Sequence, residues 1–248
     1  MSDAEMISQC VLFFMAGYET TATTISYATY LLAENPESQE RLFEESKNIF
    51  NTKSDIDYDA IERLEYLNGV VMETLRLYPP AVAVEREASE DIVLTSDEDR
   101  INVFKGDLFQ IPINVLHMDR QHFDDPYAFK PQRTPSLRAP TVWCGPSQLY
   151  VLHMDRQHFD DPYAFKPQRF MASNIAHHPY AHLPFGAGPR NCVAKRLALM
   201  EAKLALIYSV HNFKFEICDK TARPPERYYN LGLNVPKEVL LRVVKRVH

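Results

Sequence analysis

The residues best suited to chemistry lie in one short stretch, residues 185–192, with the sequence Phe-Gly-Ala-Gly-Pro-Arg-Asn-Cys. Its two glycines and its proline prevent regular structure, whereas the residues after it favour a helix. Cys192 therefore stands where a tight loop enters a helix, and the backbone N–H groups and the dipole there favour a thiolate over a thiol. Gly186 and Gly188 let the backbone approach something flat and bulky, and Arg190 adds a fixed positive charge. A thiolate held in such a loop suits an axial ligand of haem iron.

Taken alone, Cys192 favours a simpler interpretation, a buried free cysteine at an ordinary loop-to-helix junction. The spacing Phe-Gly-x-Gly-x-Arg-x-Cys changes this, because it resembles the haem-binding loop of the cytochrome P-450 superfamily, the haem-thiolate monooxygenases. The family usually has glycine two residues after the cysteine, where this chain has Ala194. The resemblance implies haem b (iron protoporphyrin IX), with its iron ligated axially by Cys192. The same loop would contact this cofactor through Phe185, Gly186, Gly188 and Arg190.

One long helix is predicted from about residue 5 to residue 33. Apolar residues occupy nearly all of its faces over residues 10–15, so its middle is expected to be buried. Residues 16–21, Ala-Gly-Tyr-Glu-Thr-Thr, make a poor helix interior and predict a local kink or a widened turn, although they could equally be a polar surface patch. They resemble the oxygen-binding stretch of the central P-450 helix. That resemblance implies that Thr20 assists dioxygen activation and that Glu19 is its acidic partner in proton delivery.

Two further helices are predicted, one over residues 36–50 after an Asn-Pro start signal and one over about residues 59–78. In the second, Glu73 and Arg76 share a face. Such pairs usually contribute little on a surface, but the neighbours here are apolar, where unpaired charges are costly. The pair resembles the family's Glu-x-x-Arg motif, which implies a buried charge network with Arg169 that braces the cysteine loop.

Short β-like segments are predicted between residues 81 and 113, and again at residues 213–217 and 239–247, with the helix after the cysteine loop ending at about residue 210. The predicted fold class is mainly α with small antiparallel β-sheets. By resemblance, it is the C-terminal, haem-binding half of the cytochrome P-450 fold, incomplete and spanning residues 1–248. The resemblance also implies that a haem propionate is held by His117, which alone would be read as a loop histidine, and the nearest basic residue for the same task is Arg86.

An internal repeat interrupts this pattern, because residues 115–133 and 151–169 are identical. Working tandem repeats diverge and come in threes or more. Only the first copy is preceded by the residues that the family pattern predicts, and only the second copy is followed by them. A deletion of about 36 residues would therefore restore a continuous family pattern. We interpret the repeat as a recent duplication or a gene-model error, in which about 36 residues form an aberrant insert extruded as a surface loop.

Composition narrows the partners and the compartment. The chain has 248 residues and a net charge of -6, which argues against nucleic acid as a partner. Its four cysteines lack CxxC spacing, so neither zinc nor a disulfide framework is indicated. The apolar run at residues 10–17 is shorter than the ~20 residues that span a bilayer. Because members of the family are about twice this length, we expect the C-terminal half of a longer protein, with its membrane anchor absent from this chain.

The motifs follow one another in the family's order, and the resemblance is closest to animal microsomal members. It implies a monooxygenase that hydroxylates lipophilic small molecules with dioxygen and with electrons that an NADPH-dependent flavin reductase supplies. For the full-length parent it implies the endoplasmic reticulum membrane. The alternative is a truncated, catalytically inactive fragment that cannot bind haem stably. A haem-thiolate isomerase is disfavoured by the presence of Thr20.

Overall fold

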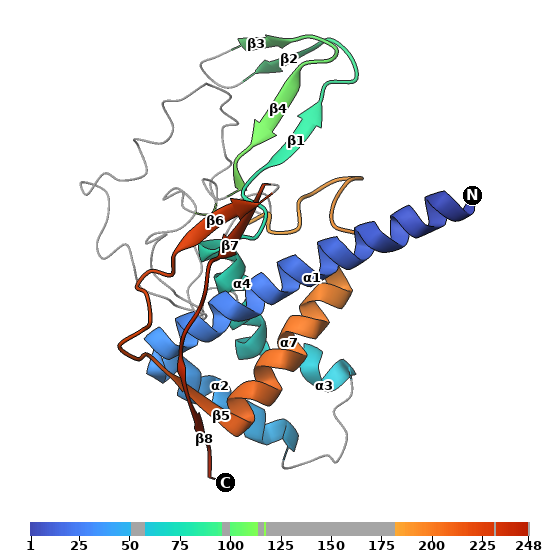
Figure 1. Ribbon diagram of the computed structural model, residues 1–248. Coiled ribbons are helices and arrows are strands. Elements are labelled where there is room, and N and C mark those ends of the chain that lie inside the picture. The colour runs from blue at the N-terminus through green and yellow to red at the C-terminus, as the bar shows by residue number, and fades with distance from the viewer. Residues whose placement is uncertain (51–57, 96–99, 114–116, 118–181, 231, 248) are drawn as a thin grey trace, which may run out of the picture.

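The computed structural model describes residues 1–50, 58–95, 100–113, 117, 182–230 and 232–247. Within these residues the helices are α1 (Asp3–Glu34), α2 (Pro36–Phe50), α3 (Tyr58–Glu62), α4 (Glu65–Leu77) and α7 (Lys195–Asn212) (Figure 1). The strands are β1 (Val84–Glu87), β2 (Ile92–Thr95), β3 (Arg100–Val103), β4 (Leu108–Ile111), β5 (Phe213–Glu216), β6 (Arg227–Asn230), β7 (Leu233–Pro236) and β8 (Arg242–Lys245).

The strands form antiparallel pairs rather than one sheet. β1 pairs with β4 and β2 pairs with β3, so that the described residues 84–95 and 100–111 form two paired segments that stand at the top of Figure 1. β5 pairs with β8, and β6 pairs with β7. The predicted class, mainly α with small antiparallel sheets, is confirmed. The β6–β7 hairpin was not predicted from the sequence.

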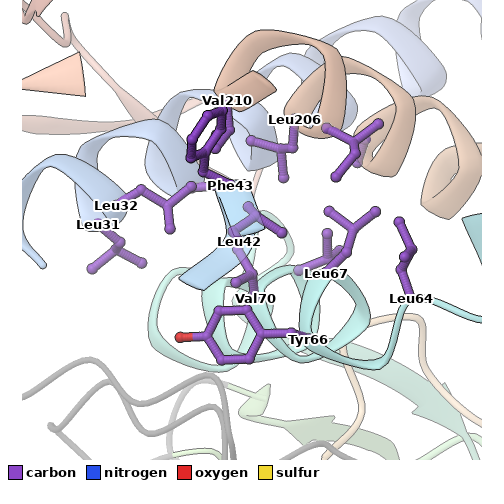
Figure 2. Packing of buried hydrophobic residues seen from close by; sticks show 14 of the residues in the cluster. Leu31, Leu32, Leu42, Phe43, Leu64, Tyr66, Leu67, Val70, Leu206 and Val210 are labelled. Carbon is purple, nitrogen blue, oxygen red and sulfur yellow. The ribbon is translucent and has the colours of Figure 1, made fainter. Parts of the chain in front are cut away.

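Among the described residues, the hydrophobic core lies mainly between α1, α2, α4 and α7, with Ile61 added from α3. α1 contributes its C-terminal half, and α2, α4 and α7 pack against it and against one another. Leu42, Leu67 and Leu206, from three of these helices, are fully buried. Figure 2 shows these side chains meeting in the centre of the cluster. The helix α7, which follows the candidate cysteine loop, is therefore held by the core itself.

The N-terminal half of α1 is not part of this core. In Figure 1 this half projects beyond the point where α1 crosses α7. The first buried residue of α1 as a whole is Thr23. The apolar side chains before that point are largely exposed, Leu12 by 58% and Phe14 by 73%. The predicted burial of residues 10–15 is therefore wrong within the described part of the chain. Apolar residues on every face call for burial, but none of the described elements packs over this half of the helix.

The predicted helix over residues 59–78 is divided into α3 and α4. The break follows from the carboxylate of Glu45 on α2, which accepts hydrogen bonds from the backbone N–H groups of Tyr66 and Leu67 at 2.9 and 2.8 Å. These two donors belong to the first turn of α4 and have no carbonyl partner within the helix. An acidic side chain from another helix thus defines where α4 begins.

Replacing Glu45 with alanine is expected to destabilise the fold by about 1–2 kcal/mol, the usual effect of losing a helix cap. Burial raises the pKa of Glu45, more than the hydrogen bonds from Tyr66 and Leu67 lower it. Because the folded-state pKa lies above the unfolded one, the contribution of Glu45 is complete below the unfolded pKa and declines as the pH rises through the folded pKa. Urea unfolding of both proteins at several pH values should show the largest difference in acid, and a difference that grows toward neutral pH would contradict this.

Candidate functional site

Cys192 closes a compact loop in front of α7. Its backbone N–H donates to the carbonyl of Phe185 at 2.9 Å, which ties the two ends of the loop together. α7 begins at Lys195, and the N-cap residue Ala194 makes no side-chain capping hydrogen bond. Cys192 is free and exposed, so the alternative of a buried structural cysteine does not describe it. The loop therefore presents a thiol at the entrance of a helix.

The two glycines of the loop have backbone conformations that favour glycine. Gly186 has φ +69° and Gly188 has φ +80°, both in the left-handed region. A Cβ atom at position 186 would meet only ordinary contacts, 3.9 Å to Cα of Asn191 and 4.0 Å to Cγ1 of Val84. The glycine is therefore needed for its backbone angle and not for space among the described residues. Arg190 lies exposed between this turn and Cys192.

Two glycine-to-alanine variants are expected to change stability in opposite directions. Gly186→Ala places a side chain at positive φ and should cost about 1 kcal/mol. Gly17→Ala lies inside α1, where a Cβ atom would meet nothing within 4 Å, and should stabilise the fold by about 0.5–1 kcal/mol through helix propensity. Urea midpoints of the two variants measure this difference. The same sign in both variants would be the contrary result.

Thr20 and Glu19 lie together on α1, which packs against α7. The Thr20 hydroxyl donates to the carbonyl of Ala16 at 2.6 Å, one turn earlier. Both threonine and glutamate are partly buried. The predicted widened turn is wrong, because residues 16–21 are regular α-helix (Figure 1). The hydroxyl bonds along the helix and leaves the backbone ladder intact.

Glu73 and Arg76 form a buried ion pair with both side chains fully excluded from solvent. The guanidinium Nε and Nη2 atoms donate to the two carboxylate oxygens, each at 2.7 Å. This bidentate geometry on adjacent turns of α4 is the strong form of an arginine–carboxylate contact. Arg169, predicted as a third member, lies outside the described residues.

His117 connects this ion pair to the segment that leads into the cysteine loop. Its backbone carbonyl accepts from Nη1 of Arg76 at 3.2 Å, and its ring Nε2 accepts from the backbone N–H of Leu183 at 2.8 Å. The ring of His182 lies 4.7 Å from that of His117, and its Nε2 is 3.2 Å from the carbonyl of Met72. These contacts could not be inferred from local patterns, because the partners are 66 and 110 residues apart in the chain. The predicted propionate contact of His117 stays a prediction.

Arg86, on β1, also reaches the loop. Its Nη2 atom donates to the carbonyl of Ala187 at 3.2 Å, between the two glycines. The same guanidinium donates through Nη1 to the carbonyl of Glu85. The hairpin of β1 and β4 is thus attached to the loop by a positively charged side chain.

These residues fit a haem group. The exposed sulfur of Cys192 supplies the donor type of a haem-thiolate centre, and the glycines leave the backbone beside it uncovered. Two exposed apolar side chains, Val193 at 82% and Leu197 at 62%, follow directly and offer surface to a flat apolar ring. Arg86 and Arg190 place positive charge at the loop, which suits the carboxylates of the group.

Comparison with known proteins tests the assignment. The family model for Cytochrome P450 matches residues 1–134 and 147–242, nearly the whole chain. The chain belongs to the cytochrome P450 family. The described helices and small sheets are accordingly part of the P450 fold, and the two matched segments each contain one copy of the repeat.

Animal P450 proteins are among the most similar relatives. Cytochrome P450 3A2 of Rattus norvegicus is 36% identical over 246 residues, and Cytochrome P450 3A29 of Sus scrofa is 34% identical over 247 residues. Cytochrome P450 3A6 of Oryctolagus cuniculus is 35% identical over 247 residues. Each match covers 99% of this chain and 41% of the relative. The chain therefore spans about two fifths of the length of these P450 relatives.

None of the described helices has a stretch long and apolar enough to cross a bilayer.

Proposed function

We propose that this chain carries the haem-thiolate centre of a monooxygenase that hydroxylates lipophilic small molecules, with Cys192 as the axial ligand of haem b. The observation that carries the proposal is the exposed Cys192 thiol, held in a closed loop at the start of α7 in a chain of the P450 family. Its helix is anchored in the core through Leu206 and Val210, so the sulfur has a rigid base.

The bound haem would supply the reduction of dioxygen and oxygen transfer to a C–H bond, with electrons from NADPH through a flavin reductase. The chain's own residues hold and orient this group. Cys192 provides the thiolate, Arg190 provides positive charge, and Phe185 and the two glycines shape the loop. Glu73 and Arg76 brace the fold behind it.

Thr20 and Glu19 would hold and transfer protons for this chemistry. A hydroxyl group has one hydrogen to donate and two positions to accept. In the structure the hydrogen of Thr20 is directed to the carbonyl of Ala16, so proton delivery requires this hydroxyl to rotate away from that carbonyl. Glu19 precedes it by one residue and can exchange a proton with solvent, because it is only partly buried.

The exposed apolar half of α1 supports a lipophilic substrate class. Leu12, Phe13 and Phe14 present aliphatic and aromatic surface before Thr20, and apolar ligands bind to such surface once it is enclosed. The proposal places the full-length parent at the endoplasmic reticulum membrane.

The test is an absorption spectrum of the chain supplied with haem, reduced and exposed to carbon monoxide. A Soret band of the type that thiolate ligation produces supports the proposal. A band of the type without thiolate, in a chain that circular dichroism shows to be folded, would contradict Cys192 as the ligand.

A second candidate is a fragment of such an enzyme that is inactive and does not retain haem. The observation that favours it is the same apolar surface of α1, because none of the described elements encloses the region beside Thr20. Complete absence of haem absorption after gel filtration of folded, soluble chain would select this candidate. Retention of one haem per chain would exclude it.

A further inference from the structure

We infer that His117 is a positioning residue for the cysteine loop and acts through its imidazole ring. It links the buried Glu73–Arg76 pair to the backbone that precedes Cys192. The inference rests on the proposed function in one respect only, the identity of Cys192 as the haem ligand. It differs from a contact with haem, because His117 acts here through Leu183.

A continuous series of hydrogen bonds connects the two ends. Arg76, fixed by its bidentate pairing with Glu73, donates to the carbonyl of His117 at 3.2 Å. The ring of His117 accepts from the N–H of Leu183 at 2.8 Å.

Inside the loop the series continues through the backbone. The carbonyl of Leu183 accepts from the N–H of Gly186 at 3.0 Å, and the carbonyl of Phe185 accepts from the N–H of Cys192 at 2.9 Å. Every step from the ion pair to the backbone of the cysteine is therefore a hydrogen bond between described groups, or it passes through the covalent structure of one residue or one peptide bond.

The chemistry of the ring explains why histidine serves here. His117 is fully buried, and so a backbone N–H that points to it has no access to solvent. Its Nε2 atom accepts a hydrogen bond, so the neutral ring must carry its hydrogen on Nδ1. A buried N–H without an acceptor is costly, and thus the ring holds Leu183 in one position.

The ring also lies against the same segment through its face. The ring of His182, one residue before Leu183, lies beside it in a tilted arrangement with ring centroids 4.7 Å apart, and its Nε2 is 3.2 Å from the carbonyl of Met72 on α4. Two adjacent residues of the segment are thus held from α4, one through His117 and one directly. This fixes the position from which the loop starts.

A pair of amide variants separates this role from general packing. The carbonyl oxygen of glutamine in His117→Gln can take the place of Nε2, whereas the shorter side chain in His117→Asn places its oxygen near Nδ1 and cannot reach Leu183. The contact from Arg76 goes to the backbone carbonyl, so both variants keep it. The two differ by one methylene group, and therefore in whether the N–H of Leu183 has an acceptor.

Backbone amide exchange in the chain without haem provides the readout. His117→Asn is expected to speed exchange at Leu183, Gly186 and Cys192 by at least about tenfold, with His117→Gln within about threefold of the unmodified chain. Amides of α4 and α7 should keep their protection in both. Gln39→Leu is the control for lost stability elsewhere, because Gln39 bridges α1 and β5 by hydrogen bonds to Leu32 and Phe215.

Equal exchange in the two His117 variants, including unfolding of both, would overturn the inference. So would faster exchange of the loop in Gln39→Leu to the same degree as in His117→Asn. This measurement needs no haem, so it tests the role of His117 even if the chain proves not to bind haem through Cys192. In chain that does bind haem, His117→Asn should also lose part of its thiolate-type Soret band, and His117→Gln should keep it.

Discussion

The variant Glu73→Gln is expected to lose about 3–5 kcal/mol of folding free energy, the usual result of removing one partner from a buried ion pair. Arg76 would keep its charge with both side chains excluded from solvent. The glutamine amide has one acceptor oxygen, so it could accept only one of the two 2.7 Å hydrogen bonds that the carboxylate accepts. Because the total stability of a domain is about 5–15 kcal/mol, this variant should be close to unfolding.

Urea unfolding followed by circular dichroism measures this loss. The matched control is Glu44→Gln, because Glu44 and Lys47 have the same i, i+3 spacing on α2 at 2.6 Å but are exposed. The control should change stability by no more than about 0.5 kcal/mol. Equal losses of folding free energy in the two variants would show that burial is not the reason why the Glu73–Arg76 pair contributes to stability.

The double variant Glu73→Leu/Arg76→Met should be less destabilised than Glu73→Gln, since it removes both charges of the pair and not one alone. It will not recover the full stability, because the carbonyl of His117 loses its hydrogen bond from Arg76. A double variant less stable than the single one would indicate that the arginine contributes more through its other contacts than through the pair.

The second large effect is expected for Cys192→Ser. Replacing the sulfur with a hydroxyl removes the thiolate, and the thiolate-type Soret band of the reduced, carbon-monoxide-bound chain should disappear completely. Folding should change little, because the side chain is exposed and its backbone N–H still donates to Phe185. Persistence of an unchanged band would show that another residue ligates the iron.

Cys10→Ser and Cys218→Ser are the matched controls, since Cys10 is also a free, exposed cysteine and Cys218 is a free, partly exposed one. Cys218 differs in one respect, because the hydroxyl of Thr221 hydrogen-bonds its sulfur and lowers the pKa of the thiol. Both controls should retain the full band. Loss of the band in either control would contradict the assignment of Cys192 as the haem ligand.

The helices and the cysteine loop could be predicted because their determinants are local. The Asn-Pro start of α2 and the run of apolar residues in α7 are signals contained within a few turns of sequence. The glycines of the loop indicate by themselves that the backbone there adopts conformations that favour glycine. α7 begins at Lys195, two residues later than its composition suggests, because Val193 and Ala194 complete a turn. Differences of that size reflect how a loop joins a helix.

Other features depended on distant residues and could not be predicted. The division between α3 and α4 is produced by Glu45, which lies 21 residues before Tyr66. The link from His117 to Leu183 joins residues with no common pattern. Residues 10–15 were predicted to be buried and are exposed. The pattern of apolar residues indicates which side chains favour burial, but it does not show whether another element packs against them.

That exposed half of α1 has a practical consequence for purified protein. Attraction between such apolar surfaces strengthens on warming from the cold and in the presence of sulfate, and the patches that water-soluble monomers tolerate rarely exceed a few hundred Å². A chain that presents Leu12, Phe13 and Phe14 to water will associate with itself as it is concentrated, most of all when warm or salted out. Cold buffers and mild detergents that coat these side chains will keep it dispersed.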